Sequence, residues 1–418
     1  MATSNPKPGL QQKTTATRER IVFALLAASA GALLTLALLS HLHDSAPPDM
    51  MTFYTSGTML RRGLQSKVYD ETSQITYQRQ LFGPSVPTEV NPHPPFETLI
   101  FVPLTYLPFP TAYVLWGLLN LILLGWSLYL LKPFATHFDT ESRVTLALAG
   151  LCPLISTLRE GQDQILLVLV CVGAFICLKK RREFEAGAVL GAGLFRFQFV
   201  LPLLVIFVAL RKWKIAVGTA CVGAMLGLTS LVVFGWGGVR QYISLVESFA
   251  RSAAMLRLVP AMPNVRGFVY ILMAGRAEPR YMAALVAAGS LVLLAWPIIE
   301  WRRRPWDPGN RTFDLLFALS VVVSVMISYH LLVNGMLLLI VPALLLLNYT
   351  AGAYARGPRR WSSMLPLICL FLMTILLNLA AGNRLSFLFL PILWLAFVIS
   401  GEISHAREQA GGGARGHF

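Results

Sequence analysis

Acidic, histidine, arginine and amide side chains interrupt an otherwise apolar sequence at a small number of places. The side chains that we single out as candidates for chemistry are Asp49, Tyr54, His93, Glu97, Gln162, Arg196, Arg257, Asn264, Arg266 and His330. An arginine can donate two parallel hydrogen bonds to a phosphate, and a carboxylate can accept the proton of a hydroxyl group. Because the surrounding sequence is apolar, this combination predicts transfer of a group from a phosphorylated lipid to a hydroxyl acceptor.

Several of these residues also have a purely structural explanation. Asp49 follows two prolines and could cap a short helix. His93 could be a turn residue in a proline-rich stretch, and His330 could bond to a neighbouring helix from within an apolar run. Arg196 could extend its charged end to a membrane surface instead of binding phosphate. For the sequence alone, both explanations stay open.

Metal and disulfide chemistry find no support in the sequence. The five cysteines lie in apolar segments, and no two of them have the Cys-x-x-Cys spacing that is typical of zinc sites. The carboxylates form no cluster with the spacing of metal ligands. We therefore predict no metal, no cofactor and no disulfide framework.

The composition is that of an integral membrane protein. Of the 418 residues, 56% are hydrophobic and only 13% are charged, and the mean hydropathy is +0.62. Residues 21–40 carry no charge and are long enough to cross a hydrocarbon core of ~30 Å as a helix, and we interpret them as a retained span and not as a signal peptide. Comparable apolar runs occupy residues 281–299, 315–347 and 361–383.

The basic residues predict the orientation in the membrane. The net charge is +15, and Lys and Arg fall mainly in short clusters between apolar runs, as topology signals do. No aromatic RNA-binding motif accompanies them, so we predict no nucleic-acid partner. One orientation, with both termini in the cytoplasm, puts four strong basic clusters on the same side of the membrane.

This map predicts an all-α integral membrane fold. We expect a cytoplasmic tail (residues 1–20), one transmembrane domain (21–401) of about 12 transmembrane helices, and a second cytoplasmic tail (402–418). Residues 96–107 are expected to form a re-entrant or interfacial helix. Two long external loops are expected at about residues 42–95 and 235–280. Residues 186–208 begin and end beside basic clusters, so they should double back as a hairpin with Arg196 near the outer side.

Short motifs follow one another in an order that can be compared with known families. They are Asp49 with Phe53-Tyr54, Gly63 with Val68-Tyr69-Asp70, His93-Pro94-Pro95-Phe96, Pro103-Leu104, Leu107-Pro108, Gly161-Gln162, Ala186-Gly187, Leu190-Gly191, Met262-Pro263-Asn264-Val265-Arg266-Gly267 and the His330 segment. Their order and the hydropathy around them resemble the family 87 glycosyltransferases, which are bacterial membrane enzymes of the GT-C class. The resemblance runs from about residue 20 to residue 400.

The resemblance implies a GT-C-type bundle that transfers a sugar, mannose in this family, from a polyprenyl-phosphate donor to an external hydroxyl with inversion. It implies Asp49 as the general base, and His330 as a second catalytic residue beside the leaving phosphate. The implied contacts are Arg266, Arg196 and Arg257 for the donor phosphate, and Tyr54, His93, Gln162, Asn264 and Glu97 for the sugar or acceptor. The implied partners are the lipid-linked donor, which is a substrate and not a cofactor, a glycolipid or glycan acceptor, and the bilayer. The implied location is a bacterial inner membrane, with the active site on the periplasmic face.

Two positions depart from the family pattern. Residues 195–198 read Phe-Arg-Phe-Gln where a Lys-Pro-type sequence is expected, which leaves the identity of the phosphate contact open. Asp163-Gln164 follows Gly161-Gln162 where a hydrophobic residue and asparagine are more usual.

Two other classes of function also fit a polytopic basic protein. One is a flippase or transporter of lipid-linked sugars, which should show inverted repeats and charges near the membrane midplane. The other is a non-catalytic scaffold of an envelope assembly complex, which would leave the external Asp, His and Arg residues unexplained.

Overall fold

The apolar runs form helices because a helix satisfies its own backbone hydrogen bonds, as an apolar environment requires. The computed structural model describes residues 48–354, 357–379 and 384–412, and within these ranges it holds helices and no strand. The α-helices are α2 (Pro48–Arg61), α3 (Glu71–Phe82), α4 (Pro95–Phe101), α5 (Phe109–Leu131), α6 (Thr140–Glu160), α7 (Gln164–Lys179), α8 (Glu183–Ala192), α9 (Phe197–Ala209), α10 (Trp213–Arg251), α11 (Ala253–Leu258), α12 (Val265–Met273), α13 (Pro279–Arg302), α14 (Arg311–Ile327), α15 (Ile340–Ala353), α16 (Pro358–Leu379) and α17 (Phe389–Gly412). The 3₁₀ helices are η1 (Gln65–Lys67), η2 (Val102–Tyr106), η3 (Lys132–Phe134), η4 (Gly193–Arg196), η5 (Val259–Ala261), η6 (Asn334–Leu339) and η7 (Leu385–Leu388).

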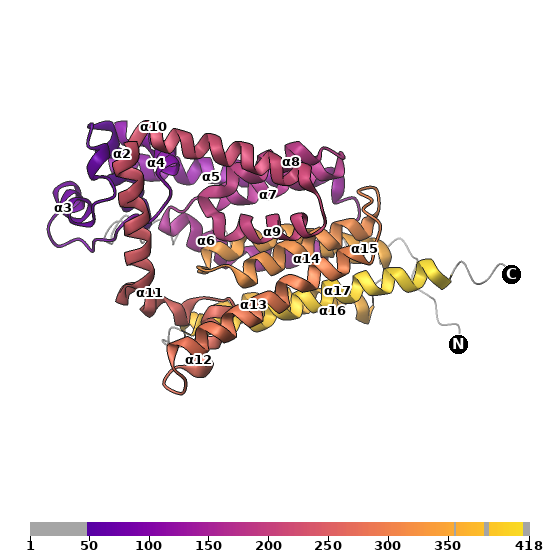
Figure 1. The fold of residues 1–418 in the computed structure, drawn as a ribbon. Helices are drawn as coiled ribbons and strands as arrows, with labels where there is room; N and C mark the ends of the chain where they lie inside the picture. The colour runs from indigo at the N-terminus through magenta and orange to yellow at the C-terminus, as the bar shows by residue number, and fades with distance from the viewer. Residues whose placement is uncertain (1–47, 355–356, 380–383, 413–418) are drawn as a thin grey trace, which may run out of the picture.

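The long helices run side by side, and α2, α3, α4 and α11 gather at one end of the bundle (Figure 1). Seven segments of the described chain are long and apolar enough to cross a membrane. The count of about 12 spans is not confirmed, because α7 and α14 have only 16 and 17 residues. The predicted span at residues 21–40 and the tail at residues 1–20 lie outside the described residues. α17 continues past residue 401, so the expected boundary of the C-terminal tail falls inside a helix.

The two segments expected as long external loops are largely helical. Residues 48–82 form α2, η1 and α3, and the second segment holds the end of α10 followed by α11, η5 and α12. α10 changes direction at Gly235, whose φ of 67° and ψ of 172° are not helical, and beyond this kink it turns toward α11 (Figure 1). The expected re-entrant helix is divided into α4 and η2, which are each too short to span a bilayer.

The hairpin expected at residues 186–208 is present as α8, η4 and α9. Its two ends meet, since Lys212 Nζ, which follows α9, lies 2.9 Å from Glu183 Oε1 at the start of α8. The whole segment is apolar enough to count as one span by composition, yet η4 interrupts it and the chain returns. The hairpin therefore presents Arg196 at its turn, away from the end where it begins.

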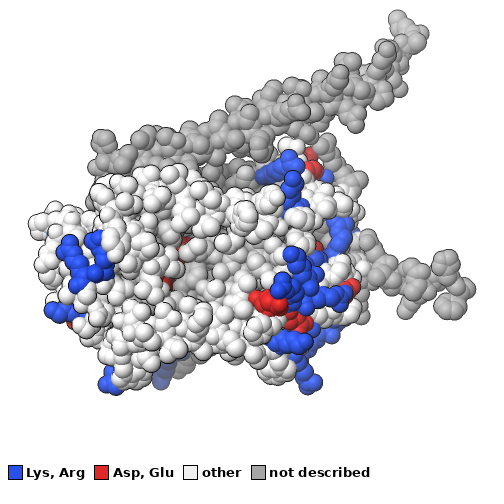
Figure 2. Space-filling model, turned by 90° about the horizontal axis from the view of Figure 1, so that it is seen from above, with Lys and Arg blue, Asp and Glu red and all other residues white. Residues whose placement is uncertain are grey.

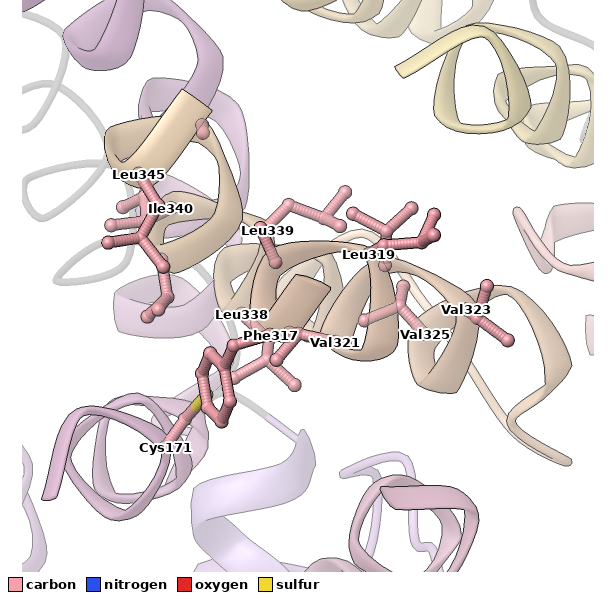
Figure 3. Packing of buried hydrophobic residues seen from close by; sticks show 14 of the residues in the cluster. Cys171, Phe317, Leu319, Val321, Val323, Val325, Leu338, Leu339, Ile340 and Leu345 are labelled. Atoms are coloured by element: carbon pink, nitrogen blue, oxygen red, sulfur yellow. The ribbon is translucent and has the colours of Figure 1, made fainter. Parts of the chain in front are cut away.

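α14 lies at the centre of the bundle. Every residue from Leu315 to Met326 is buried, as expected for a helix that is apolar around its whole circumference. Figure 3 shows Phe317 of α14 beside Cys171 of α7, with the leucines of η6 and α15 packed on the same helix. This core fixes the position of the segment after α14, residues 329–335, which reaches the candidate site.

Gly187 and Gly218 bring α8 and α10 into close contact. A methyl group at Gly187 would lie 2.0 Å from the carbonyl oxygen of Ile215, and one at Gly218 would lie 2.1 Å from that of Phe184. Small residues of this kind let membrane helices approach closely. We expect Gly187→Ala to force the helices apart and to lower the thermal unfolding midpoint in detergent, at a cost of about 1–3 kcal/mol. Gly117→Ala on α5, where nothing lies within 4 Å, is the control, and equal losses in the two variants would contradict this packing.

Candidate active site

A cavity of about 710 Å³ lies at the end of the bundle that holds α2 and α11. Its walls come from segments far apart in the sequence: the start of α2, residues 89–94, the end of α6, the start of α7, the turn between α8 and α9, residues 329–335 and the end of α16. Polar residues form one part of the wall, and the other part is apolar. The apolar part includes Phe249, Met255, Leu258, Leu332, Ile375 and Leu379. A cavity of this kind suits a ligand with a polar head and a hydrocarbon chain.

Asp49 stands in the first turn of α2, where the helix dipole favours a negative charge. Its Oδ2 accepts a hydrogen bond of 2.6 Å from Gln162 Nε2, and its side chain lines the cavity. Burial raises the pKa of Asp49 above its ordinary value, while Gln162, His93 and Arg196 act to lower it. A carboxylate with a raised pKa at a cavity wall is suited to act as a general base.

Gln162 is fixed from its other side by Arg196. Its Oε1 accepts a hydrogen bond from Arg196 Nη2, so its Nε2 must point toward Asp49. Gln162 lines the cavity but is only 5% exposed. The two hydrogen bonds orient Gln162 toward Asp49, and its predicted contact to the sugar or acceptor stays a prediction.

Arg196 lies at the turn of the hairpin and is buried beside Asp163. Its Nε donates a hydrogen bond of 2.9 Å to Asp163 Oδ1, and its Nη2 contacts the same oxygen. The two departures from the family pattern are therefore partners in one ion pair. Because this guanidinium is already paired, Arg196 is less suited to be the main phosphate contact than we predicted, although it lines the cavity.

Glu97 and His93 complete a buried cluster around this ion pair. His93 Nδ1 lies 2.9 Å from Glu97 Oε1. Burial raises the pKa of Glu97 to about 7 and that of Asp163 to about 6, and it lowers the pKa of His93 to about 3. The two carboxyl groups interact, since a hydrogen bond between them acts to lower the pKa of Glu97 and to raise that of Asp163, as expected where Asp163 is the donor. Glu97 is 0% exposed and does not line the cavity, so in this structure it lies behind the cavity wall, and its predicted contact to the sugar or acceptor stays a prediction.

We expect Glu97→Gln to change how stability depends on pH. The pKa of Glu97 is about 7 in the folded protein against 4.5 ordinarily, so between these values the folded state keeps a proton that the unfolded state has lost. Glu97 therefore lowers stability as the pH rises through this window, and glutamine does not. Thermal unfolding is measured from pH 5 to 8. The unfolding midpoint of the variant should rise relative to that of the wild type as the pH increases from 5 to about 7. The exposed Glu71→Gln is the control, and a difference for Glu97→Gln that stays constant with pH would contradict the raised pKa.

His330 follows α14 and faces the same cavity. Its Nδ1 is buried and has no hydrogen-bond partner among the described residues. Burial lowers the pKa of His330 to about 4, so its ring is neutral at pH 7 and can donate one hydrogen bond. Gln164 Oε1 is also buried without a partner and lines the cavity. Two unpaired polar atoms in one cavity wall indicate a site for a polar ligand.

Two of the predicted sugar or acceptor contacts make hydrogen bonds within the protein. Tyr54 does not line the cavity, and its hydroxyl donates a hydrogen bond of 2.7 Å to the Leu107 carbonyl oxygen. Asn264 caps α12: its Oδ1 accepts from Gly267 N, and its Nδ2 donates to the Ser328 carbonyl oxygen, both at 2.8 Å. Asn264 is fully buried and holds the segment that carries His330, and its predicted contact to the sugar or acceptor stays a prediction.

The remaining predicted phosphate contacts lie outside the wall of the cavity. The Arg266 guanidinium stacks on the Tyr329 ring, 4.3 Å from its centroid, and Tyr329 does line the cavity. Arg266 is thus placed at the rim, where its charge also acts on His330. Arg257 is exposed on α11 and is not among the lining residues.

Some residues of the site were not predicted as such. Asp163 and Gln164 belong to the polar turn between α6 and α7, where the run of polar residues from 159 to 164 was the available signal. Gln164, Asn334 and Asn378 line the cavity; the position of Asn334 one turn beyond His330 was a signal in the sequence, whereas Asn378 is a single polar residue in an apolar run.

Glu89 and Glu160 add two carboxyl groups to the wall that holds Asp49. Among the described residues, no group of three or more His, Cys, Asp or Glu side chains could hold a metal ion.

Comparison with known proteins assigns the family. The model of glycosyltransferase family 87 matches residues 91–328, which is more than half of the chain. No curated protein and no solved structure matches the chain. The matched region contains His93, Gln162 and Arg196, while Asp49 and His330 lie outside it and are joined to it by the geometry of the cavity. With the apolar helices described above, this match shows that the chain is a membrane protein that belongs to glycosyltransferase family 87.

Proposed function

We propose that the protein transfers a sugar, with mannose as the expected one, from a polyprenyl-phosphate donor to a hydroxyl group of an external glycolipid or glycan. The observation that carries this proposal is the position of Asp49, which Gln162 orients at the wall of a cavity that also offers His330 and an apolar surface. The family supports sugar transfer in general, and the cavity supports a donor that is a lipid.

In the proposed reaction, Asp49 takes the proton of the acceptor hydroxyl as that oxygen attacks the anomeric carbon. The bond between the anomeric carbon and the phosphate oxygen breaks on the opposite side, so the configuration inverts and polyprenyl phosphate leaves. His330, which is neutral at pH 7, donates a hydrogen bond to the leaving phosphate. Arg266 at the rim supplies positive charge to the same group.

The polyprenyl chain would follow the apolar part of the wall. This part includes Phe249, Met255 and Leu258 from α10 and α11, and Ile375 and Leu379 at the end of α16. Contacts of this kind stabilise a long isoprenoid by removing apolar surface from water. The proposed location is a bacterial inner membrane, with the cavity on the periplasmic face and both termini in the cytoplasm.

The distribution of charge favours transfer over transport. Figure 2 shows Lys and Arg gathered toward the two ends of the molecule, with a largely uncharged stretch between them. A transporter should instead place its charged binding residues near the membrane midplane. The observed arrangement suits an enzyme that works at one membrane surface.

The test is transfer of label from radiolabelled polyprenyl-phosphate mannose to a lipid extract of the host by the purified protein in detergent. We expect a new labelled product with the wild type and none with Asp49→Asn. If mannose stays on the donor, other polyprenyl-phosphate sugars are tested in the same way. Retention of label on every donor would overturn the proposed function.

A further inference from the structure

A second cavity lies at the opposite end of the bundle, between the turn that joins α9 to α10 and the turn that joins α13 to α14. It has a volume of about 410 Å³. Its lining residues are Ala209, Leu210, Arg211, Lys212, Trp301, Arg302, Arg304 and Trp306. Four of these eight side chains are basic and two are tryptophan, so the cavity joins positive charge to an aromatic wall.

Elsewhere at this end, several basic side chains are neutralised by carboxylates of the protein. Lys179 Nζ lies 2.6 Å from Asp314 Oδ1, and Arg181 Nη2 lies 3.0 Å from Asp307 Oδ1. Figure 2 shows such red and blue residues side by side at one end of the molecule. These pairs need no further partner.

Two of the arginines that line the cavity are not part of such ion pairs. Lys212 pairs with Glu183, and Arg304 pairs with Glu300. Arg302 donates a hydrogen bond only to a backbone carbonyl oxygen, that of Ala209, and no carboxylate of the described chain lies within ion-pair distance of Arg211 or Arg302. A topology signal requires positive charge on this side of the membrane, but it does not require two unpaired arginines to converge on one cavity.

The backbone conformation of Arg211 is further evidence that its positive charge has a function. Arg211 has a φ of 59°, in the left-handed region where glycine usually ends a helix. It closes α9 through hydrogen bonds from Arg211 N to the Val208 carbonyl oxygen and from Lys212 N to that of Phe207. Arg181 has the same conformation, and its guanidinium is used in an ion pair. A strained arginine is expected to persist where its charge is needed.

We propose that this cavity binds the phosphate of an anionic phospholipid, with Arg211 and Arg302 as its main contacts. Planar guanidinium groups donate paired hydrogen bonds to phosphate oxygens, and basic pockets between membrane helices are suited to anionic headgroups. A lipid is favoured over free phosphate because the cavity opens between the ends of membrane helices. Ile299, one turn before Arg302 on α13, is exposed and offers apolar surface to an acyl chain, and Trp306 lines the cavity with Lys212 Nζ 4.0 Å from its ring centroid.

The experiment is a titration of the thermal unfolding midpoint of the full-length protein in neutral detergent. The three additives are dioleoyl phosphatidylglycerol, dioleoyl phosphatidylcholine and glycerol 3-phosphate, which carries the phosphate without acyl chains. We expect phosphatidylglycerol alone to raise the midpoint in a saturable manner. An equal effect of phosphatidylcholine would overturn the choice of an anionic lipid, and an equal effect of glycerol 3-phosphate would overturn the choice of a lipid.

Matched variants assign the response to the cavity. Arg211→Gln with Arg302→Gln should weaken the apparent affinity for phosphatidylglycerol about ten-fold. Lys214→Gln with Arg303→Gln removes the same charge from the same two turns, at exposed positions that do not line the cavity, and should leave the affinity unchanged. Arg211→Gly relieves the left-handed backbone, so it should fold at least as well as the wild type and still lose affinity. Equal losses in both double variants, or a wild-type response in Arg211→Gly, would contradict the proposal.

Discussion

Asp49→Asn should lower the turnover number by about 10³-fold, because general-base catalysis contributes on that order. Asparagine has nearly the same shape, and its side-chain oxygen can still accept the hydrogen bond of 2.6 Å that Gln162 Nε2 donates. The fold and the cavity should therefore survive, and the loss should fall on the chemical step. The measurement is the initial rate of label transfer at saturating donor, with folding checked by size-exclusion elution and unfolding midpoint.

A neighbouring carboxyl group provides the matched control for this prediction. Glu89 lines the same cavity but has no hydrogen bond to Gln162. Glu89→Gln removes one carboxyl group from the wall, as Asp49→Asn does, and should change the rate far less. A loss in Glu89→Gln as large as that in Asp49→Asn would show that the charge of the wall matters and not a single base. Normal transfer by Asp49→Asn would remove Asp49 from the mechanism, although the family assignment would stand.

The pH dependence gives the same assignment an independent readout. The base must be ionised, so the rate should fall as the pH falls through the pKa of Asp49. Burial raises that pKa, and the fall should therefore begin at a higher pH than for an ordinary aspartate. Asp49→Asn should remove this acid-side fall from whatever residual rate remains.

The fold class followed from composition, because apolar segments of this length have few alternatives to membrane helices. The hairpin around Arg196 was also predictable, since basic clusters at both ends of residues 186–208 require the chain to return to the side it left. The number of membrane spans was harder to predict from the sequence. α14 is buried on all sides within the protein, and its 17 residues look like a span in sequence although the lipid does not surround it. Length and hydropathy cannot separate burial in protein from burial in lipid.

The candidate site was predictable as a list of polar residues but not as a set of roles. Asp49, His93, Gln162, Arg196 and His330 were all predicted, and all line one cavity. Which of them touches substrate depends on hydrogen bonds between residues far apart in the chain. Sequence spacing does not encode such contacts, so Gln162 as an orienting group could be found only from the structure.

Arg196→Met should destabilise the protein by about 3–5 kcal/mol, because it leaves the carboxyl group of Asp163 buried without its partner. Adding Asp163→Asn removes that carboxyl group, and the double variant should regain much of the lost stability. Arg182→Met, in the exposed pair with Glu185, is the control and should have little effect. Thermal unfolding in detergent is measured for the wild type, the single variants Arg196→Met and Asp163→Asn, the double variant and the control Arg182→Met, and losses of the two single variants that simply add in the double variant would show that the two residues do not act as a pair.

Activity should not return with stability in this double variant. Arg196 is also the donor that fixes Gln162 Oε1, and through Gln162 it orients Asp49. Without Arg196, the amide of Gln162 can rotate and present its oxygen to Asp49, which removes the hydrogen bond that lowers the pKa of this carboxyl group. The transfer rate should therefore remain low and its acid-side fall should move to higher pH, while the unfolding midpoint recovers. If the double variant regained both the transfer rate and the unfolding midpoint, the ion pair would have only a structural role. The departure of the chain from the family pattern at both positions would then be a matter of packing alone.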